Sequence, residues 1–150
     1  MVPLTVMVVA WIVFRILGVA GGMAVVDSWT EALRFALATM FVFTAASHFI
    51  PRTRNDLVRM VPPGLPVPGL LIAATGVLEL AGAIGLLLSG VVRIAAYGLI
   101  ALLVAMFPAN VHAARMQLPI AGQPAMPLIT RLPLQFFWIG ALWWVAHDAL

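Results

Sequence analysis

The sequence predicts an all-α protein: a polytopic transmembrane bundle of five helices that forms one domain over residues 1–150. The first observation behind this prediction is composition, because 64% of the residues are hydrophobic and 9% are charged, whereas soluble domains carry about 25% charged residues. The second is length, since a helix that crosses the hydrocarbon core needs about 20 apolar residues. Segments of this kind occupy residues 3–25, 31–50, 68–89, 92–113 and 128–147.

Composition also excludes several classes of function. The chain has no cysteine, which excludes disulfides, thiol chemistry and cysteine-ligated iron–sulfur clusters. The eight lysine and arginine positions are all arginine, most of them lie near the ends of apolar segments, and they form no stripe. They therefore indicate topology and contact with anionic lipids, and no nucleic acid is expected as a partner. No polar stretch is long enough for a soluble catalytic domain. We therefore predict no catalytic residues.

Short connections define two helical hairpins. Residues 26–30 separate the first two apolar segments and residues 90–91 separate the third and fourth, so each pair must turn back on itself. The first segment lacks a basic start and exceeds the 7 to 15 residues of a secretory apolar region. It is therefore predicted to be a retained helix.

Two longer connections are rich in proline and lie on one side of the membrane. Most of the prolines of the chain lie in residues 51–67 and 114–127, between the apolar segments. Proline favours extended or turn conformations. Within the first connection, residues 55–60 are compatible with one short interfacial helical turn. Both connections are therefore predicted to be largely irregular.

Arginine counting gives an orientation, because short cytoplasmic loops carry an excess of arginine and lysine. The opposite side of the predicted bundle carries Arg34 and Arg93. The side of the long connections carries Arg52, Arg54, Arg59, Arg115 and Arg131. The long connections and the N-terminus are therefore predicted to be cytoplasmic and the C-terminus external. His147 and Asp148 are then expected to be solvated on the external surface.

Glu79 is the exceptional residue, because it lies near the middle of an apolar segment, where an ionised carboxylate costs several kcal/mol. Small residues at three- and four-residue steps, including Gly76 and Ala83, share its helix face and let a neighbouring helix approach closely. Glu79 is thus predicted to face protein. Two interpretations stay open: a buried pair that holds the bundle together, or a group that handles a proton, an ion or a ligand.

An arginine is the expected partner of Glu79. Arg15 lies about 18 Å along the first helix, close to the depth of Glu79 on a helix that runs in the same direction, and is the first choice. Arg34 and Arg93 are the alternatives. Removing one member of such a buried pair strands the other charge.

A second polar group lies toward the long-connection side. His48 ends the second segment, and Asn110 and His112 end the fourth, so the three side chains are candidates for contact with a quinone or another ligand. The competing interpretation is that both histidines simply complement helix dipoles. No third metal ligand accompanies them, so we predict neither a metal site nor a haem.

The order of several motifs resembles one known family. The motifs are RFALATMFVFTAASHFIP, MVPPGLPVPG, TGVLELAGAIGLL and FPANVHAA, and together they make residues 31–147 similar to the DoxX family of small bacterial and archaeal membrane proteins. The resemblance implies a four-helix core to which the first helix is an addition. It also makes Arg34 and Arg93 the cationic candidates that match the family, since Arg15 lies outside the similar region.

The resemblance implies two functional expectations. The family is named for subunits of quinone-linked oxidoreductases, so the first is an accessory or quinone-contacting subunit of a membrane redox complex, without its own catalytic centre and with a quinone as the candidate cofactor. The alternative is a non-catalytic assembly, chaperone or lipid-binding protein. Expected partners are membrane lipids, redox-complex subunits or a second copy of the chain. The expected location is a prokaryotic cell membrane, crossed several times.

Overall fold

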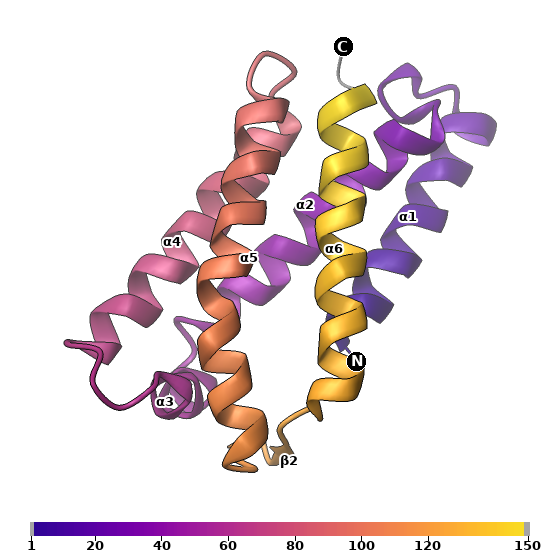
Figure 1. The fold of residues 1–150 in the computed structure, drawn as a ribbon. Helices are drawn as coiled ribbons and strands as arrows, with labels where there is room; N and C mark the ends of the chain where they lie inside the picture. The colour runs from indigo at the N-terminus through magenta and orange to yellow at the C-terminus, as the bar shows by residue number, and fades with distance from the viewer. Residues whose placement is uncertain (1, 149–150) are drawn as a thin grey trace.

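The computed structural model describes residues 2–148 and confirms the all-α class (Figure 1). Helices account for nearly all of its regular structure. The elements in order are α1 (Val2–Gly21), the 3₁₀ turn η1 (Ala24–Val26), α2 (Trp29–Ser47), α3 (Pro51–Met60), α4 (Pro68–Leu87), α5 (Val92–Arg115), β1 (Pro119–Ile120), β2 (Gln123–Pro124) and α6 (Leu128–Asp148).

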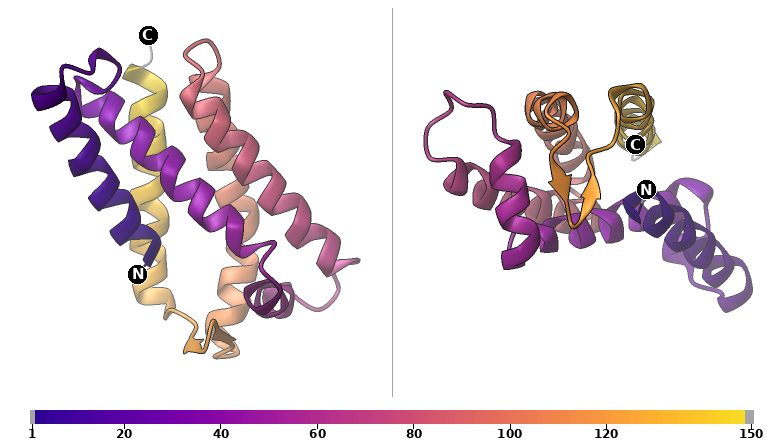
Figure 2. Two further views of the ribbon diagram at one scale, coloured as in Figure 1. Left: turned by 180° about the vertical axis from the view of Figure 1, so that it is seen from behind. Right: turned by 90° about the horizontal axis from the view of Figure 1, so that it is seen from below.

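The long helices form two layers, with α2 at the centre. Seen from behind, α1, α2 and α4 lie side by side in one layer, and α5 and α6 lie behind them (Figure 2). Helix α2 packs against α1, α4 and α6, while α5 packs against α4 and α6. The two sharp turns, η1 and the α4–α5 connection, lie at one end of the bundle, and α3 and the β-hairpin lie at the other.

Four of the described helices, α1, α4, α5 and α6, are long and apolar enough to cross a membrane by length and composition. Helix α2 reaches that standard only together with α3, from which it is separated by a 90° bend. Most large apolar side chains on the outer faces of these helices are exposed, which suits a lipid environment. The chain is thus compatible with a multi-pass membrane protein.

The bend between α2 and α3 follows from Pro51. Its ring nitrogen donates no hydrogen bond, which ends the ladder of α2, but it is well suited to the first position of a new helix, and α3 starts there. The Thr53 hydroxyl hydrogen-bonds the Ser47 carbonyl at 2.7 Å, which satisfies one of the last acceptors of α2. The short helical turn expected at residues 55–60 is therefore present within a longer helix, α3, which already begins at Pro51.

The second long connection contains a β-hairpin that the sequence analysis missed. Its turn places Ala121 and Gly122 at positive φ, the backbone geometry of tight hairpin turns, although alanine rarely adopts it. The Ala121 amide donates to Asp56 Oδ2 at 2.9 Å. The hairpin is thereby tied to α3, and the two long connections form one cap over this end of the bundle.

The apolar core lies between α2 and the α4, α5 and α6 helices, with Leu37, Phe41, Leu86, Leu99 and Leu142 almost completely buried. Helix α1 contributes one fully buried side chain, Met7, because most of its surface faces outward. The core therefore belongs mainly to the helices from α2 onward, and α1 is an outer addition packed on α2.

A glycine sets the distance between α2 and α4. A Cβ atom added to Gly76 would lie 2.6 Å from the His48 Cβ and 2.9 Å from the Phe49 ring. Only glycine lets α4 approach the end of α2 this closely, which is the behaviour expected of small residues at membrane helix contacts.

We expect Gly76→Ala to lower the stability of the bundle by about 1 to 3 kcal/mol through overpacking. Thermal unfolding in mild detergent measures the effect. The matched control is Gly98→Ala on α5, since a Cβ there meets no heavy atom within 4 Å. Equal melting temperatures for the two variants would contradict the assigned α2–α4 contact.

Candidate functional site

Glu79 is buried inside the bundle, with 4% of its surface exposed. It lies on the face of α4 that carries Gly76 and Ala83, which are also buried. This is the face that packs against α2. The prediction that Glu79 points toward protein therefore agrees with its position in the structure.

The nearest polar partner of Glu79 is His48, which caps the C-terminus of α2. His48 Nε2 lies 3.5 Å from Glu79 Oε2, and the other ring nitrogen, Nδ1, lies 3.0 Å from the Ile72 carbonyl oxygen. A carbonyl oxygen only accepts hydrogen bonds, so Nδ1 carries a proton. In a neutral ring Nε2 then presents a lone pair to the carboxylate.

His48 Nε2 and Glu79 Oε2 can form a hydrogen bond only when one of the two groups carries a proton at this point. A neutral His48 facing an ionised Glu79 would bring two lone pairs together, whereas a protonated Glu79 or a protonated His48 supplies a donor. Thr44 lies one turn before His48 and its hydroxyl also interacts with the carboxylate. The His48–Glu79 pair thus places two groups that can each take up a proton next to one another inside the bundle.

Arg131 is the arginine that interacts electrostatically with Glu79. It lies in the first turn of α6, its Nη2 donates to Asn110 Oδ1 at 2.8 Å, and its guanidinium carbon lies 6.0 Å from the centre of the Trp138 ring. Within the described residues no arginine approaches Glu79 within 4 Å. The positive charge therefore acts on Glu79 without an ion-pair contact, and Asn110 holds the guanidinium in place.

Two further polar side chains on α6 share the face of Arg131. Gln135 and Trp138 follow at four- and three-residue steps, which places all three on one side of the helix, and both are buried. Gln135 Nε2 donates to the Leu103 carbonyl of α5 at 2.7 Å. Helix α6 thus contributes a guanidinium, an amide and an indole to the interior.

Several atoms of this group lack a hydrogen-bond partner, although buried polar atoms usually have one. The unpartnered buried atoms are Glu79 Oε2, Arg131 Nε, Gln135 Oε1 and Trp138 Nε1. Two of them donate and two accept in the ordinary states of these side chains. We call the residues Thr44, His48, Glu79, Asn110, Arg131, Gln135 and Trp138 the interior polar cluster.

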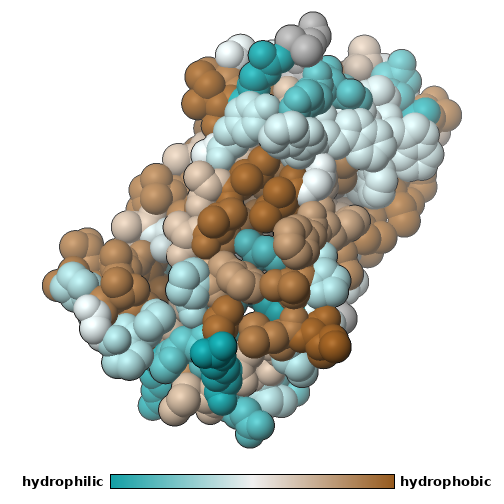
Figure 3. All heavy atoms as spheres, in the orientation of Figure 1, coloured by the Kyte–Doolittle hydropathy of each residue, from teal (hydrophilic) through white to brown (hydrophobic). Residues whose placement is uncertain are grey.

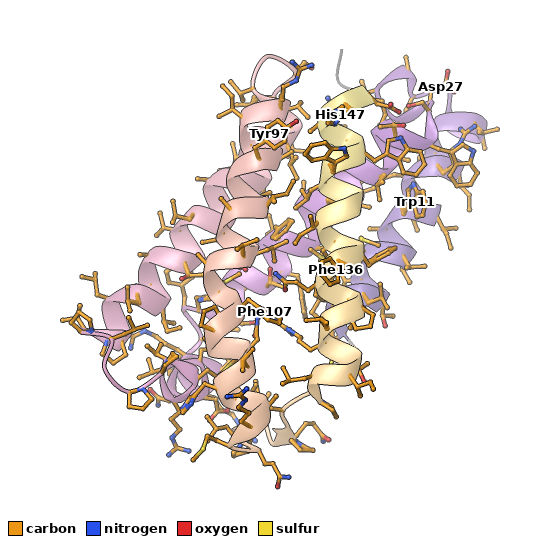
Figure 4. The ribbon with its side chains drawn as sticks, viewed as in Figure 1. Trp11, Asp27, Tyr97, Phe107, Phe136 and His147 are labelled. Atoms are coloured by element: carbon orange, nitrogen blue, oxygen red, sulfur yellow. The ribbon has the colours of Figure 1, made fainter. Side chains whose placement is uncertain are left out.

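The interior polar cluster lies beneath the seam between α5 and α6. Hydrophilic side chains are visible there at the centre of an otherwise apolar surface (Figure 3). Nitrogen-bearing side chains lie in the same space, near Phe107 on α5 and Phe136 on α6 (Figure 4). The contacts of Arg131 with Asn110 and of Gln135 with the Leu103 carbonyl also lie between α6 and α5.

The predicted pairing of Glu79 with Arg15 is wrong in this structure. Helix α2 lies between α1 and α4 (Figure 2), which keeps Arg15 on α1 away from Glu79 on α4. The guanidinium of Arg15 instead stacks over the Trp29 ring, with its carbon 5.2 Å from the ring centre. Depth along a helix was a poor guide because it says nothing about which helices are neighbours.

The two alternative arginines are also placed elsewhere. Arg34 forms an ion pair with Glu31 at 2.6 Å, nearly four turns from His48 on the same helix. Arg93 Nε donates to the Ala146 carbonyl at 3.4 Å, near the opposite end of the bundle from α3. Neither lies in the interior polar cluster, so the predicted pairs of Glu79 with Arg34 and with Arg93 are wrong as well.

Of the three residues predicted to contact a ligand, His48 and Asn110 lie in the interior polar cluster and His112 does not. His48 and Asn110 both join the interior polar cluster, linked through Glu79 and Arg131. His112 follows Asn110 by two residues and so projects about 200° around α5 from it, and it is only partly buried. Among residues 2–148 no group of three or more histidine, cysteine or acidic side chains is arranged to hold a metal ion.

The sequence analysis missed Arg131, Gln135 and Trp138 as site residues. Arg131 was counted as an interfacial charge because it follows a long connection, and the other two looked like ordinary members of an apolar helix. The spacing of these three polar-tipped side chains, by four and then three residues, places them on one face of α6 and is the feature of the sequence that indicates partners for a buried carboxylate.

The fold and the interior polar cluster define the class as an all-helical protein with several segments suited to membrane crossing. A family model described as "Domain of unknown function (DUF8561)" matches residues 37–146, so the chain belongs to that family. The match includes every residue of the interior polar cluster and leaves out α1. Comparisons with curated proteins and with solved structures found no match.

We expect Glu79→Gln and Arg131→Gln to be coupled in a double-mutant cycle by about 0.5 to 3 kcal/mol, since the two residues share one polar network. Unfolding in detergent by heat or denaturant gives the four stabilities. Glu79→Gln with Arg15→Gln provides the control cycle, for which additivity is expected. Stronger coupling of Glu79 to Arg15 than to Arg131 would contradict the arrangement of helices described above.

Proposed function

We propose that this protein is an accessory, quinone-contacting subunit of a membrane redox complex, with no catalytic centre of its own. The observation that carries the proposal is the His48–Glu79 pair, a histidine and a carboxylate 3.5 Å apart inside the bundle beside unpartnered donors and acceptors. Reduction and oxidation of a quinone are accompanied by proton uptake and release. A protonated pair next to free hydrogen-bonding atoms is suited to that chemistry.

The chemistry of the cluster matches both redox forms of such a ligand. A quinone carbonyl accepts hydrogen bonds, which Arg131 Nε and Trp138 Nε1 are free to donate. A hydroquinone hydroxyl donates, and Gln135 Oε1 is free to accept. A quinone also partitions into the bilayer, and in this proposal its ring approaches through the seam between α5 and α6.

The resemblance to the DoxX family supports the same proposal, since that family is named for subunits of quinone-linked oxidoreductases. The chain contains no cysteine, and the described residues contain no metal-binding group. In this proposal the electrons therefore come from a partner chain. The role of the protein is to bind the ring, orient it and hold or pass a proton at His48 and Glu79.

A second candidate function, membrane assembly or lipid binding, is favoured by α1. This helix packs on α2 and η1 and leaves most of its apolar surface exposed, including Val9, Ile12 and Ile16. An apolar groove of about 660 Å³ runs between α1 and α2, from Val2 to Phe14. A partner helix or an acyl chain fits such a groove, and this role is compatible with the first proposal.

We also propose that the chain crosses a prokaryotic cell membrane five times, with α2 as the fifth span and the N-terminus in the cytoplasm. Arg52, Arg54 and Arg59 lie on α3 or beside it, and Arg115 lies at the end of α5 near the hairpin. Arg34 is buried in an ion pair at the other end. The excess of arginine on the α3 side supports a cytoplasmic location for the long connections.

We expect the protein purified in mild detergent to carry quinone, measured by mass spectrometry of an organic extract and expressed per mole of protein. Trp138→Phe removes the indole donor while keeping an aromatic ring, and should lower the retained quinone by about tenfold, the effect of one hydrogen bond near 1.4 kcal/mol. The exposed Asp27→Asn is the matched control and should change nothing. A parent protein that retains phospholipid and no quinone would support the assembly role instead.

The orientation is tested with single cysteines, which are unambiguous because the chain has none of its own. Cysteine at the exposed Asn55 on α3 should be protected from an impermeant thiol reagent in intact cells, whereas cysteine at the exposed Ser89 should react. Permeabilisation should make Asn55→Cys reactive. The reverse pattern before permeabilisation would overturn the proposed topology.

A further inference from the structure

We propose that a polar pocket at the η1 end of the bundle binds a phosphoethanolamine group. The pocket has a volume of about 380 Å³ and lies where the start of α2 meets the end of α6. Its polar lining consists of Ser28, Thr30, Glu31, Arg34, His147 and Asp148. His147 and Asp27 mark this end of the molecule in Figure 4, far from the seam that covers the interior polar cluster.

One wall of the pocket is suited to an anion. Arg34 lines it although 94% of the residue is buried, and its Nε has no hydrogen-bond partner. Its Nη2 is held by Glu31 at 2.6 Å, which fixes the direction of the guanidinium. The positive end of the α2 dipole lies at the same place. A phosphate group bound here gains charge-assisted hydrogen bonds from a preorganised donor.

Another part of the lining is suited to a cation. Asp148 Oδ2 accepts hydrogen bonds from the Thr30 hydroxyl at 2.6 Å and from Trp144 Nε1 at 2.9 Å, so the carboxylate is fixed beside the pocket with its other oxygen free of these bonds. This acceptor favours a primary ammonium, which donates hydrogen bonds, over a trimethylammonium, which is recognised by aromatic faces.

The position of the pocket indicates a group carried by a lipid. Trp29, Trp143 and Trp144 are each about half exposed at this end of the bundle, and tryptophan gathers at the level of lipid headgroups. A zwitterion with phosphate and ammonium two carbons apart matches the adjacent positive and negative walls. His147 and Asp148 were expected from the sequence to be merely solvated, but here they line the pocket.

Native mass spectrometry of the detergent-purified protein tests the inference. We expect the parent to retain phosphatidylethanolamine over phosphatidylglycerol and phosphatidylcholine at equal supply. Asp148→Asn should weaken this retention by about tenfold, because one charge-assisted hydrogen bond is lost. The variant should still fold, since asparagine also accepts from Thr30 and Trp144. Asp27→Asn, a nearby exposed carboxylate outside the pocket, is the control.

A parallel arm uses free phosphoethanolamine and measures the melting temperature. Stabilisation of the parent by the free compound alone would assign the site to a soluble zwitterion, and retention of the lipid would assign it to a headgroup. Both results support recognition of the phosphoethanolamine group. Equal retention of all three lipids with no effect of the free compound, or retention unchanged in Asp148→Asn, would overturn the inference.

Discussion

The burial of Glu79 against His48 is the constraint on which the interior of this protein depends. A carboxylate in the middle of an apolar bundle is costly unless it is neutralised or given hydrogen bonds. The histidine at the end of α2 lies close enough to share a proton with it, and this contact exists because Gly76 lets α4 approach α2. The position of Glu79, the close packing of α4 on α2 and the protonation of the His48–Glu79 pair therefore depend on one another.

The rest of the interior polar cluster extends the polar contacts of Glu79 from α2 and α4 to α5 and α6. Arg131 brings a positive charge from α6, and Asn110 on α5 fixes its direction. Buried networks of this kind are expensive when they are only partly satisfied, and this one leaves both donors and acceptors without partners. Such unsatisfied atoms are more typical of a binding site than of a structural ion pair, which favours the functional interpretation of Glu79.

The two ends of the bundle have different characters. At one end α3 and the β-hairpin form a cap that is joined by Asp56 and rich in arginine. At the other end the turns are short, tryptophans are exposed, and a small pocket combines Arg34 with Glu31 and Asp148. Helix α1 lies at the edge of the core, to which it contributes Met7, and outside the matched family region, and it supplies no residue of the interior polar cluster.

Composition and segment length alone determined that the chain is all-α and suited to a membrane, because lipid requires every spanning backbone to form its own hydrogen bonds. The sequence also placed Glu79, His48 and Asn110 as candidates, since polar residues in apolar helices are costly wherever they occur. Only the tertiary structure decided that Arg131, and not Arg15, faces the carboxylate. Helical spacing reports the face and depth of a side chain, but which helices are neighbours is set by packing between distant segments.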